Sequence, residues 1–378
     1  MNLADKGLSR NQATRTAEPP VRPPHDSGAD RQASVAIGKW AEFALVNDPL
    51  SARALRILGQ VAADAADEQR AEKLMRAAAR RSLRQSVAVY WLMRKSHDDR
   101  DYGAATRHAD TLLRTRPQLM AQVAPILARI AENEDSKAEL NKLLAGNPPW
   151  RAQFLNHLPG DISDARTPLD LFLALEDTAA PPTPADLQGY LSFLIARKLH
   201  ELAYYTWLQF LPAEQLANAG LLFNGSFEGK PSGLPFDWVI TPGSGVAINI
   251  APRPDQDAER ALLVEFGHGR VDFRGVAQLI MLSPGSYKFQ GKYQGNIVGR
   301  RGPRWRITCA DGAATPIGES RMVTGAAPVW TTFEFSLIVP RAGCRAQHVR
   351  LALDARSASE QLVSGSIWYD ELGIVRAR

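Results

Sequence analysis

The chain has 378 residues, too many for one ordinary domain, and this length predicts two or three domains. Its 45% hydrophobic and 22% charged residues are typical of a globular protein, and no run approaches the ~18 apolar residues that span a bilayer. The formal net charge of +5 is spread among interspersed acidic residues without the concentrated basic patch of a nucleic-acid binder, so we expect no nucleic-acid partner.

Residues 1–33 are polar, rich in Pro and Arg, and lack hydrophobic periodicity, which predicts a disordered N-terminal segment. The first residues contain no apolar stretch of the kind found in secretory signals. An upstream signal or anchor, lost through an incorrectly assigned start codon, remains the open alternative.

Residues 34–219 are rich in Ala, Leu and Arg, with apolar residues at helical spacing, and they predict an α-helical domain. Pro49, Leu83 and Pro117 stand 34 residues apart, as do Ala71 and Ala105. The pattern resembles the tetratricopeptide repeat, which pairs two antiparallel helices every ~34 residues. The resemblance covers about two repeats after a leading helix and fades after Pro117.

This resemblance implies a helical solenoid whose curved face binds a protein partner that the sequence does not identify. Small residues let its helices pack closely: Gly59, Ala71, Ala78 and Ala105. The acidic stretch 97–101 is expected to be a solvated turn rather than a metal site. Thr183 is the predicted N-cap of a last helical pair, with Pro184 at the first helical position. An aromatic cluster is expected to seal the end of the solenoid: Tyr190, Phe193, Tyr204, Trp207 and Phe210.

Residues 220–378 change to short alternating runs separated by Gly and Pro turns, which predicts an antiparallel β-sandwich of the jelly-roll type. The predicted fold class is therefore an α-solenoid followed by a β-sandwich. The expected strands are 261–266, 276–282, 285–295, 304–310, 331–339, 348–355 and 366–374.

The two cysteines, Cys309 and Cys344, both lie in or beside predicted strands of the sandwich. Two interpretations are open: a pair of buried free thiols, or one disulfide that joins neighbouring strands. The disulfide would require an oxidising compartment. The sequence contains no CxxC or Cys/His cluster typical of a metal site.

Four short motifs in the second half resemble, in the same order, carbohydrate-binding jelly-roll modules related to xylan- and cellulose-binding families. They are NGSFE (224–228) followed by Trp238, SPGSY (283–287), WTT (330–332) and YDEL (369–372). The resemblance covers about residues 222–376 and makes the stretch 221–238 the expected first strand, with a tight turn at Asn224-Gly225, Phe227 entering the core and Trp238 closing over one end. It also implies a structural calcium between the first and last strands, at Glu228 and Asp370. The alternative is that these carboxylates make ordinary hydrogen bonds.

Alternation along the strands separates an apolar side from a polar side that is rich in Lys and Arg. If the strands adjoin, their polar sides form one basic sheet surface suited to an acidic polysaccharide, because Arg binds carboxylates with two parallel hydrogen bonds. An ordinary solvated face is the alternative. The large aromatic residues face the core, and Tyr293 and Trp368 are the candidates for partial exposure. The candidate carbohydrate-binding residues are Lys288, Gln290, Lys292, Tyr293, Arg304, Arg306 and Arg350.

No catalytic motif is present: the sequence lacks GxSxG, GxxxxGK[ST], HExxH and GxGxxG. We therefore predict a non-catalytic, polysaccharide-associated adaptor in the periplasm or another extracytoplasmic compartment. The solenoid would bind a protein and the jelly roll an envelope or exported glycan. A protein-binding scaffold without a sugar site is the second hypothesis, and a glycan-active enzyme on the jelly roll is the third.

Overall fold

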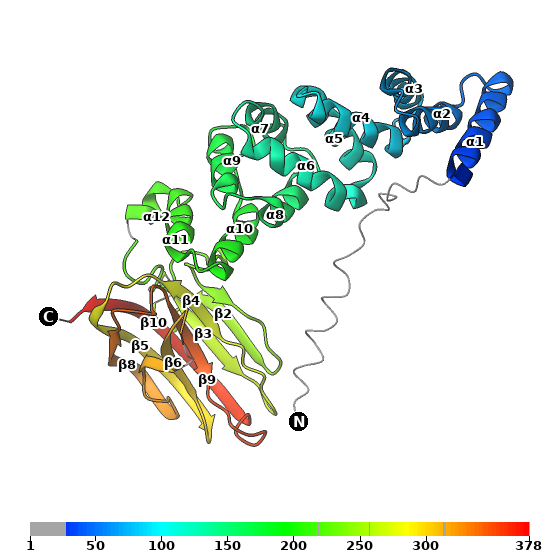
Figure 1. The fold of residues 1–378 in the computed structure, drawn as a ribbon. Coiled ribbons are helices and arrows are strands. Elements are labelled where there is room, and N and C mark those ends of the chain that lie inside the picture. Colours follow the sequence, from blue (N-terminus) through cyan, green and yellow to red (C-terminus); the bar gives the residue numbers. More distant parts are fainter. Residues whose placement is uncertain (1–27, 218, 257, 313–314, 378) are drawn as a thin grey trace. The chain divides into compact units, whose positions relative to one another are not determined.

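The computed structural model describes residues 28–217, 219–256, 258–312 and 315–377. The chain divides into two compact units, Met1–Pro182 and Thr183–Arg378. Stacked helices come first, and a two-sheet antiparallel sandwich follows them (Figure 1). This confirms the predicted fold class.

The first described helix, α1, begins at Gly28, six residues before the predicted start of the helical region. The segment 28–33, which the sequence placed with the N-terminal segment, is part of this helix. The rest of that segment, 1–27, lies outside the described residues. In the described part of the chain, no helix is both long and apolar enough to cross a membrane.

The first unit contains nine described α-helices, in which α2 packs on α3 and α4 packs on α5. Helices α2, α4 and α6 begin at Ala52, Ser86 and Met120, again 34 residues apart. The bounds are α1 Gly28–Asn47, α2 Ala52–Asp64, α3 Glu68–Arg81, α4 Ser86–Asp98, α5 Tyr102–Thr115, α6 Met120–Glu132, α7 Lys137–Ala145, α8 Arg151–Asp161 and α9 Thr167–Glu176, with a 3₁₀ turn at Pro117–Leu119.

The turn inside each of the first two helix pairs has the same construction. Ala66 and Arg100 occupy the left-handed region, at φ 60° and 61°. The next residues, Asp67 and Asp101, cap α3 and α5 by accepting a backbone N–H at 3.1 and 2.9 Å. The acidic stretch 97–101 therefore forms the end of α4 and the turn before α5, as expected.

Close helix packing depends on the small residues that the sequence singled out. A Cβ at Gly59 would lie only 3.1 Å from Met75 Cγ and Sδ, so any side chain there would press on α3. Ala71, Ala78 and Ala105 have no exposed surface. These positions are small because the paired helices leave no volume for a longer side chain.

The second unit begins with three helices that the sequence placed in the helical domain: α10 (Pro184–Ala196), α11 (His200–Gln209) and α12 (Ala213–Ala217). Thr183 caps α10 as predicted, in a reciprocal capping box with Asp186. The predicted aromatic cluster attaches these helices to the sandwich. The rings of Tyr204 and Trp207 pack against Phe236 of the sandwich at 5.2 and 5.6 Å.

Two five-stranded antiparallel sheets form the sandwich, in the orders β1-β4-β9-β6-β7 and β2-β3-β10-β5-β8 (Figure 1). All seven predicted strands are present, and β1, β2 and β7 are additional. The bounds are β1 Val239–Ile240, β2 Val246–Pro252, β3 Arg260–Phe266, β4 Val276–Ile280, β5 Gly285–Gly299, β6 Pro303–Cys309, β7 Pro316–Glu319, β8 Gly325–Val339, β9 Gln347–Leu353 and β10 Val363–Arg376.

The predicted tight turn at Asn224-Gly225 is present, but the described stretch 221–238 contains no strand, so its prediction as the first strand is wrong. Asn224 and Phe227 have positive φ values of 50° and 57°, which interrupt an extended chain. Phe227 nevertheless enters the core and stacks on Trp238 at 5.4 Å, as expected, and both rings are fully buried. Gly225 is required because a Cβ there would lie 1.9 Å from the carbonyl oxygen of Leu372.

Cys309 and Cys344 form a disulfide, which confirms the second of the two interpretations of the cysteines. Cys309 ends β6, and Cys344 lies in the loop before β9. The bond closes a loop with a sequence separation of 35 residues. Cross-linking a loop of this length restricts the unfolded chain.

We expect the double variant Cys309→Ala, Cys344→Ala to lower the free energy of unfolding of the sandwich by roughly 4 kcal/mol, the entropy of closing such a loop. Urea unfolding followed by near-ultraviolet circular dichroism measures the change. Thiol titration of the denatured, unreduced protein is the control. Two free thiols, or a loss below about 1 kcal/mol, would contradict the expected contribution of the bond.

Candidate functional site

The candidate carbohydrate-binding residues lie on two different sheets. Strand β5, with Lys288, Gln290 and Lys292, belongs to the sheet β2-β3-β10-β5-β8. Strands β6 and β9, with the three arginines, belong to the other sheet. Strands β6 and β9 adjoin, but β5 does not adjoin them, so the condition for one common basic surface is not met. The outer faces of a sandwich point away from each other.

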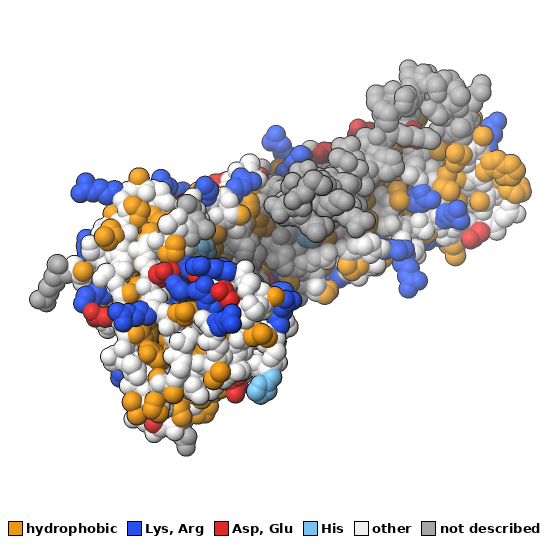
Figure 2. Space-filling model, turned by 90° about the horizontal axis from the view of Figure 1, so that it is seen from below, with side chains coloured by type: hydrophobic (Ala, Val, Ile, Leu, Met, Phe, Trp, Pro, Cys, Tyr) orange, Lys and Arg blue, Asp and Glu red, His pale blue; other side chains and the backbone are white. Residues whose placement is uncertain are grey.

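Most of the predicted basic side chains have an acidic partner on the same face. Lys288 lies 3.0 Å from Glu334, and Lys292 lies 2.6 Å from Glu371. On the other sheet the pairs are Arg304–Glu319 at 3.0 Å and Arg306–Asp354 at 3.0 Å, while Arg350 is exposed. Figure 2 accordingly shows Lys and Arg beside Asp and Glu on the visible face of the sandwich. Paired charges of this kind do not make a strong site for a polyanion.

Tyr293 faces the interior rather than the outer surface of its sheet. Its ring lies 6.0 Å from Phe333 and 6.4 Å from Tyr369, and it packs on the edge of the core while remaining partly exposed. Trp368, the other candidate for partial exposure, is also partly buried. In the sheet, Trp368 of β10 is opposite Leu263 of β3 on one side and Gln294 of β5 on the other.

A hollow of about 330 Å³ lies on the face of the second sheet and brings together two predicted residues, Gln290 and Lys292. In the register of β5 and β8, Gln290 is opposite Glu334 and Lys292 is opposite Thr332. The lining consists of Gln290, Gly291, Lys292, Thr332, Phe333, Glu334 and Glu371. The lining therefore places hydrogen-bond donors next to hydrogen-bond acceptors.

A β-bulge in β10 directs Glu371 towards this hollow. The pairing of β10 with β5 shifts register between Asp370 and Gly373, and Glu371 has a φ of 50°. Opposite the bulge, a Cβ at Gly291 would lie 2.5 Å from Leu372 Cδ2. Bulges and strained residues occur often at binding sites, where they aim a side chain. Here the bulge holds the Glu371 carboxylate against Lys292.

A buried arginine organises the acidic residues beside the hollow. Arg253 binds Asp255 through two hydrogen bonds of 3.0 and 2.9 Å, Glu259 at 2.7 Å and Asp370 at 3.0 Å. Its guanidinium lies 4.7 Å from the ring centre of Trp330. Its side chain is only 8% exposed, so these contacts replace its hydration.

Two of the three carboxyl groups bound by Arg253 have opposite pKa shifts. Burial raises the pKa of Asp370, although Arg253 and the N–H of Glu371 favour its ionised form. The hydrogen bond from Arg253 lowers the pKa of the more exposed Asp255. Asp370 is therefore the group that depends most on the buried cation to stay ionised.

Glu228 and Asp370, the residues implied for calcium, both have partners within the protein. Glu228 accepts the backbone N–H of Arg260 at 3.0 Å, and Asp370 accepts from Arg253. Among the described residues, no group of three or more His, Cys, Asp or Glu side chains could hold a metal ion. The calcium site stays a prediction.

Sequence reasoning missed Glu371, Glu334 and Arg253 as parts of this surface. The alternation of residues 331–339 places Glu334 on the polar side of its strand, so it was a recognisable partner for a lysine. Glu371 had no such signal, because the bulge that re-aims it depends on the packing of Leu372 against Gly291.

No protein-family model matches the chain, and no curated protein matches it. Similar solved structures include a family 4 carbohydrate-binding module (16% identity, 41% of this chain and 99% of that one, TM-score 0.31) and a family 16 module (17%, 42% and 100%, 0.29). A further one is a family 61 module in complex with β-1,4-galactotriose (18%, 42% and 99%, 0.28). Likeness at these identities and TM-scores does not extend to what this chain binds.

Removing the buried cation should destabilise the sandwich. We expect Arg253→Ala to lower its free energy of unfolding by about 3 to 5 kcal/mol, because Asp370 stays buried without its partner. Urea unfolding measures the loss. Arg274→Ala, which removes only the exposed pair with Asp272, is the control and should leave stability unchanged within error. Equal effects of the two variants would contradict a structural role for the Arg253 cluster.

Proposed function

We propose that this protein is a non-catalytic adaptor whose sandwich binds a polysaccharide and whose helical unit binds a protein. The order of the four sequence motifs supports the first part. The 34-residue spacing of the helix starts supports a helical unit of the tetratricopeptide type and thus the second part.

The arrangement of donors and acceptors in the hollow near Gln290 carries the proposal of glycan binding. A sugar hydroxyl donates one hydrogen bond and accepts others, so it is best met by both kinds of group at once. Gln290 supplies both kinds, Lys292 donates, and the carboxylates of Glu334 and Glu371 accept. The ring of Phe333 packs towards the core beneath these groups, beside Tyr293 and Tyr369. The strands and the bulge hold these groups in place before a ligand arrives.

The charge of the hollow favours an uncharged glycan over the acidic polysaccharide expected from the sequence. Lys292 is the one cation in the lining, and it stands with two carboxylates, Glu334 and Glu371. Lys288 pairs with Glu334 and Lys292 with Glu371, so the surface offers a polyanion no excess of positive charge. Neutral sugar units need only the hydrogen-bonding groups.

Extracytoplasmic localisation belongs to the same proposal. The disulfide between Cys309 and Cys344 supports it, because such bonds persist in oxidising compartments. A protein-binding scaffold without a sugar site is the second candidate function. A glycan-active enzyme is the third, and it requires two carboxylates that face one cleft.

Helix α1 provides a surface for the protein partner. Its side chains Trp40, Phe43 and Val46 are 74%, 64% and 80% exposed. Ile37 precedes them at the same spacing of three residues, so successive members of this set lie near each other on the helix surface. Hydrophobic side chains are prominent at that end of the helical unit in Figure 2. Because the solenoid stacks helix on helix, the occupant that fits this stripe is an amphipathic helix of the partner.

We expect glycan binding to weaken about five- to tenfold in Gln290→Ala, because one hydrogen-bonding amide is lost. Isothermal titration of the full chain with neutral and acidic polysaccharides, at low and high salt, measures the affinity. Gln215→Ala, an exposed amide on α12, is the matched control. The binding that Gln290→Ala weakens should be to neutral chains and nearly independent of salt. If no glycan binds, the scaffold without a sugar site becomes the better hypothesis.

The exposed ring of Trp40 should contribute little to the fold. We expect Trp40→Ser to change the free energy of unfolding of the helical unit by less than about 0.5 kcal/mol. Met75→Ala, which empties a buried site, should cost about 2 to 5 kcal/mol. Urea unfolding followed by helical circular dichroism compares them. A large loss in Trp40→Ser would show that this ring packs within the protein and is not reserved for a partner.

A further inference from the structure

A second hollow, of about 610 Å³, lies where helix α11 meets loops at one end of the sandwich. Three segments line it: one face of α11, the loop after β4, and the loop between β8 and β9. All three belong to the second unit. The volume is within the range of small-molecule sites. Its lining is Glu201, Tyr204, Tyr205, residues 281–284 and residues 340–345.

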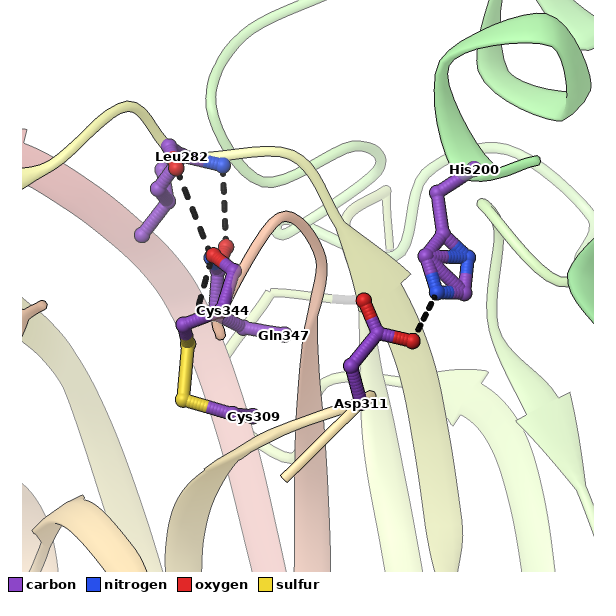
Figure 3. Close-up of a disulfide and its surroundings, with 6 residues drawn as sticks. All are labelled: His200, Leu282, Cys309, Asp311, Cys344 and Gln347. Atoms are coloured by element: carbon purple, nitrogen blue, oxygen red, sulfur yellow. Dashed lines mark hydrogen bonds and ion pairs between the residues drawn. A yellow bond between two sulfur atoms is a disulfide. The ribbon is translucent and has the colours of Figure 1, made fainter. Parts of the chain in front are cut away.

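Gln347 fixes the two loops to each other. This fully buried side chain accepts the N–H of Leu282 at 2.9 Å and donates to the carbonyl of Cys344 at 2.7 Å (Figure 3). The disulfide to Cys309 ties the second loop to the end of β6. The loop walls of the hollow are thus held by a covalent bond and a satisfied buried amide.

Helix α11 is held against the sandwich by a hydrogen bond and by aromatic packing. The buried His200 donates from Nε2 to the Oδ1 atom of Asp311 at 2.9 Å (Figure 3). Trp207 packs on Phe223 at 5.0 Å, and Tyr204 packs edge-on to Phe236 at 5.2 Å. The third wall is therefore also in place before any ligand binds.

The groups at this hollow differ in charge from those on the sheet. Arg341 and Arg345 are both exposed, and neither forms an ion pair within the part of the chain that the structure describes. Tyr205 is 66% exposed and presents an aromatic ring beside them. Glu201 is the one acid in the lining, which leaves an excess of positive charge.

We infer that this hollow binds a sugar that carries a carboxylate, such as a uronic acid unit. The two guanidinium groups match a carboxylate, which each can bind with paired hydrogen bonds. The ring of Tyr205 offers the apolar face on which a sugar ring stacks. This site is separate from the hollow near Gln290 and does not depend on glycan binding there. It gives the protein a place for acidic sugar units, which the sheet disfavours.

The test is isothermal titration of the full chain with tetragalacturonate and, as the neutral counterpart, β-1,4-galactotetraose. We expect the wild type to bind tetragalacturonate in a salt-dependent way. Arg341→Ala with Arg345→Ala should weaken this binding by at least about 30-fold, and Tyr205→Ala by about fivefold. Arg341→Lys with Arg345→Lys keeps the charge but loses the planar fork, and should weaken it by about fivefold. Binding of the neutral sugar should not change.

Arg300→Ala with Arg321→Ala is the matched control, because it removes two exposed arginines elsewhere on the sandwich. This control variant should change the affinity for tetragalacturonate less than about twofold, because it alters only the long-range electrostatic attraction. Circular dichroism verifies that each variant is folded. The proposal is overturned if the wild type does not bind tetragalacturonate. It is also overturned if the control double variant loses as much affinity as the Arg341 and Arg345 variant.

Discussion

The packing of Trp305 between the two sheets is the contact on which the sandwich depends. This buried ring comes from β6 in one sheet, and it lies 5.7 Å from Phe289 and 5.5 Å from Tyr369 in the other. Trp238, from the segment before β1, lies 5.7 Å from it as well. Because successive residues of a strand alternate, an inward ring at 305 requires Arg304 and Arg306 to face outward, and an inward Phe289 requires the same of Gln290. The chemistry of both outer surfaces follows from this core.

The face around Gln290 shows how local irregularity turns a regular sheet into a candidate site. A sheet that stayed in register would continue the alternation of β10 past Asp370. The bulge at Glu371 instead adds a carboxylate to the hollow, and Gly291 makes room for the side chain of Leu372 behind it. Beside it, Arg253 neutralises a buried carboxylate and fixes the loop after β2. The resulting surface is rich in hydrogen-bonding groups but nearly balanced in charge, which suits neutral ligands.

The end of the sandwich that carries α11 differs in both its packing and its charge. There the aromatic side chains Tyr204 and Trp207 attach the helix, and the disulfide with Gln347 fixes the loops opposite. Arg341 and Arg345, which have no acidic partner among the described residues, lie there beside the exposed Tyr205. The two surfaces therefore differ in charge: the one around Gln290 is balanced, and the hollow beside α11 is basic.

Local pattern was enough to determine the fold class, the positions of seven strands and the helix pairs, because periods of 3.6 and 2 and a 34-residue repeat are properties of neighbouring residues. The sequence also singled out Gln290 and Lys292, the part of the candidate site that alternation alone places on an outer face. It could not decide which strands are neighbours, since that depends on how the whole chain is wound, and Lys288 and Arg304 therefore proved to lie on different sheets. The pairing of lysines and arginines with acidic residues on each sheet, the positive φ of Phe227 and the bulge at Glu371 were decided by tertiary packing. Each of them arises from contacts between residues that are distant in the sequence.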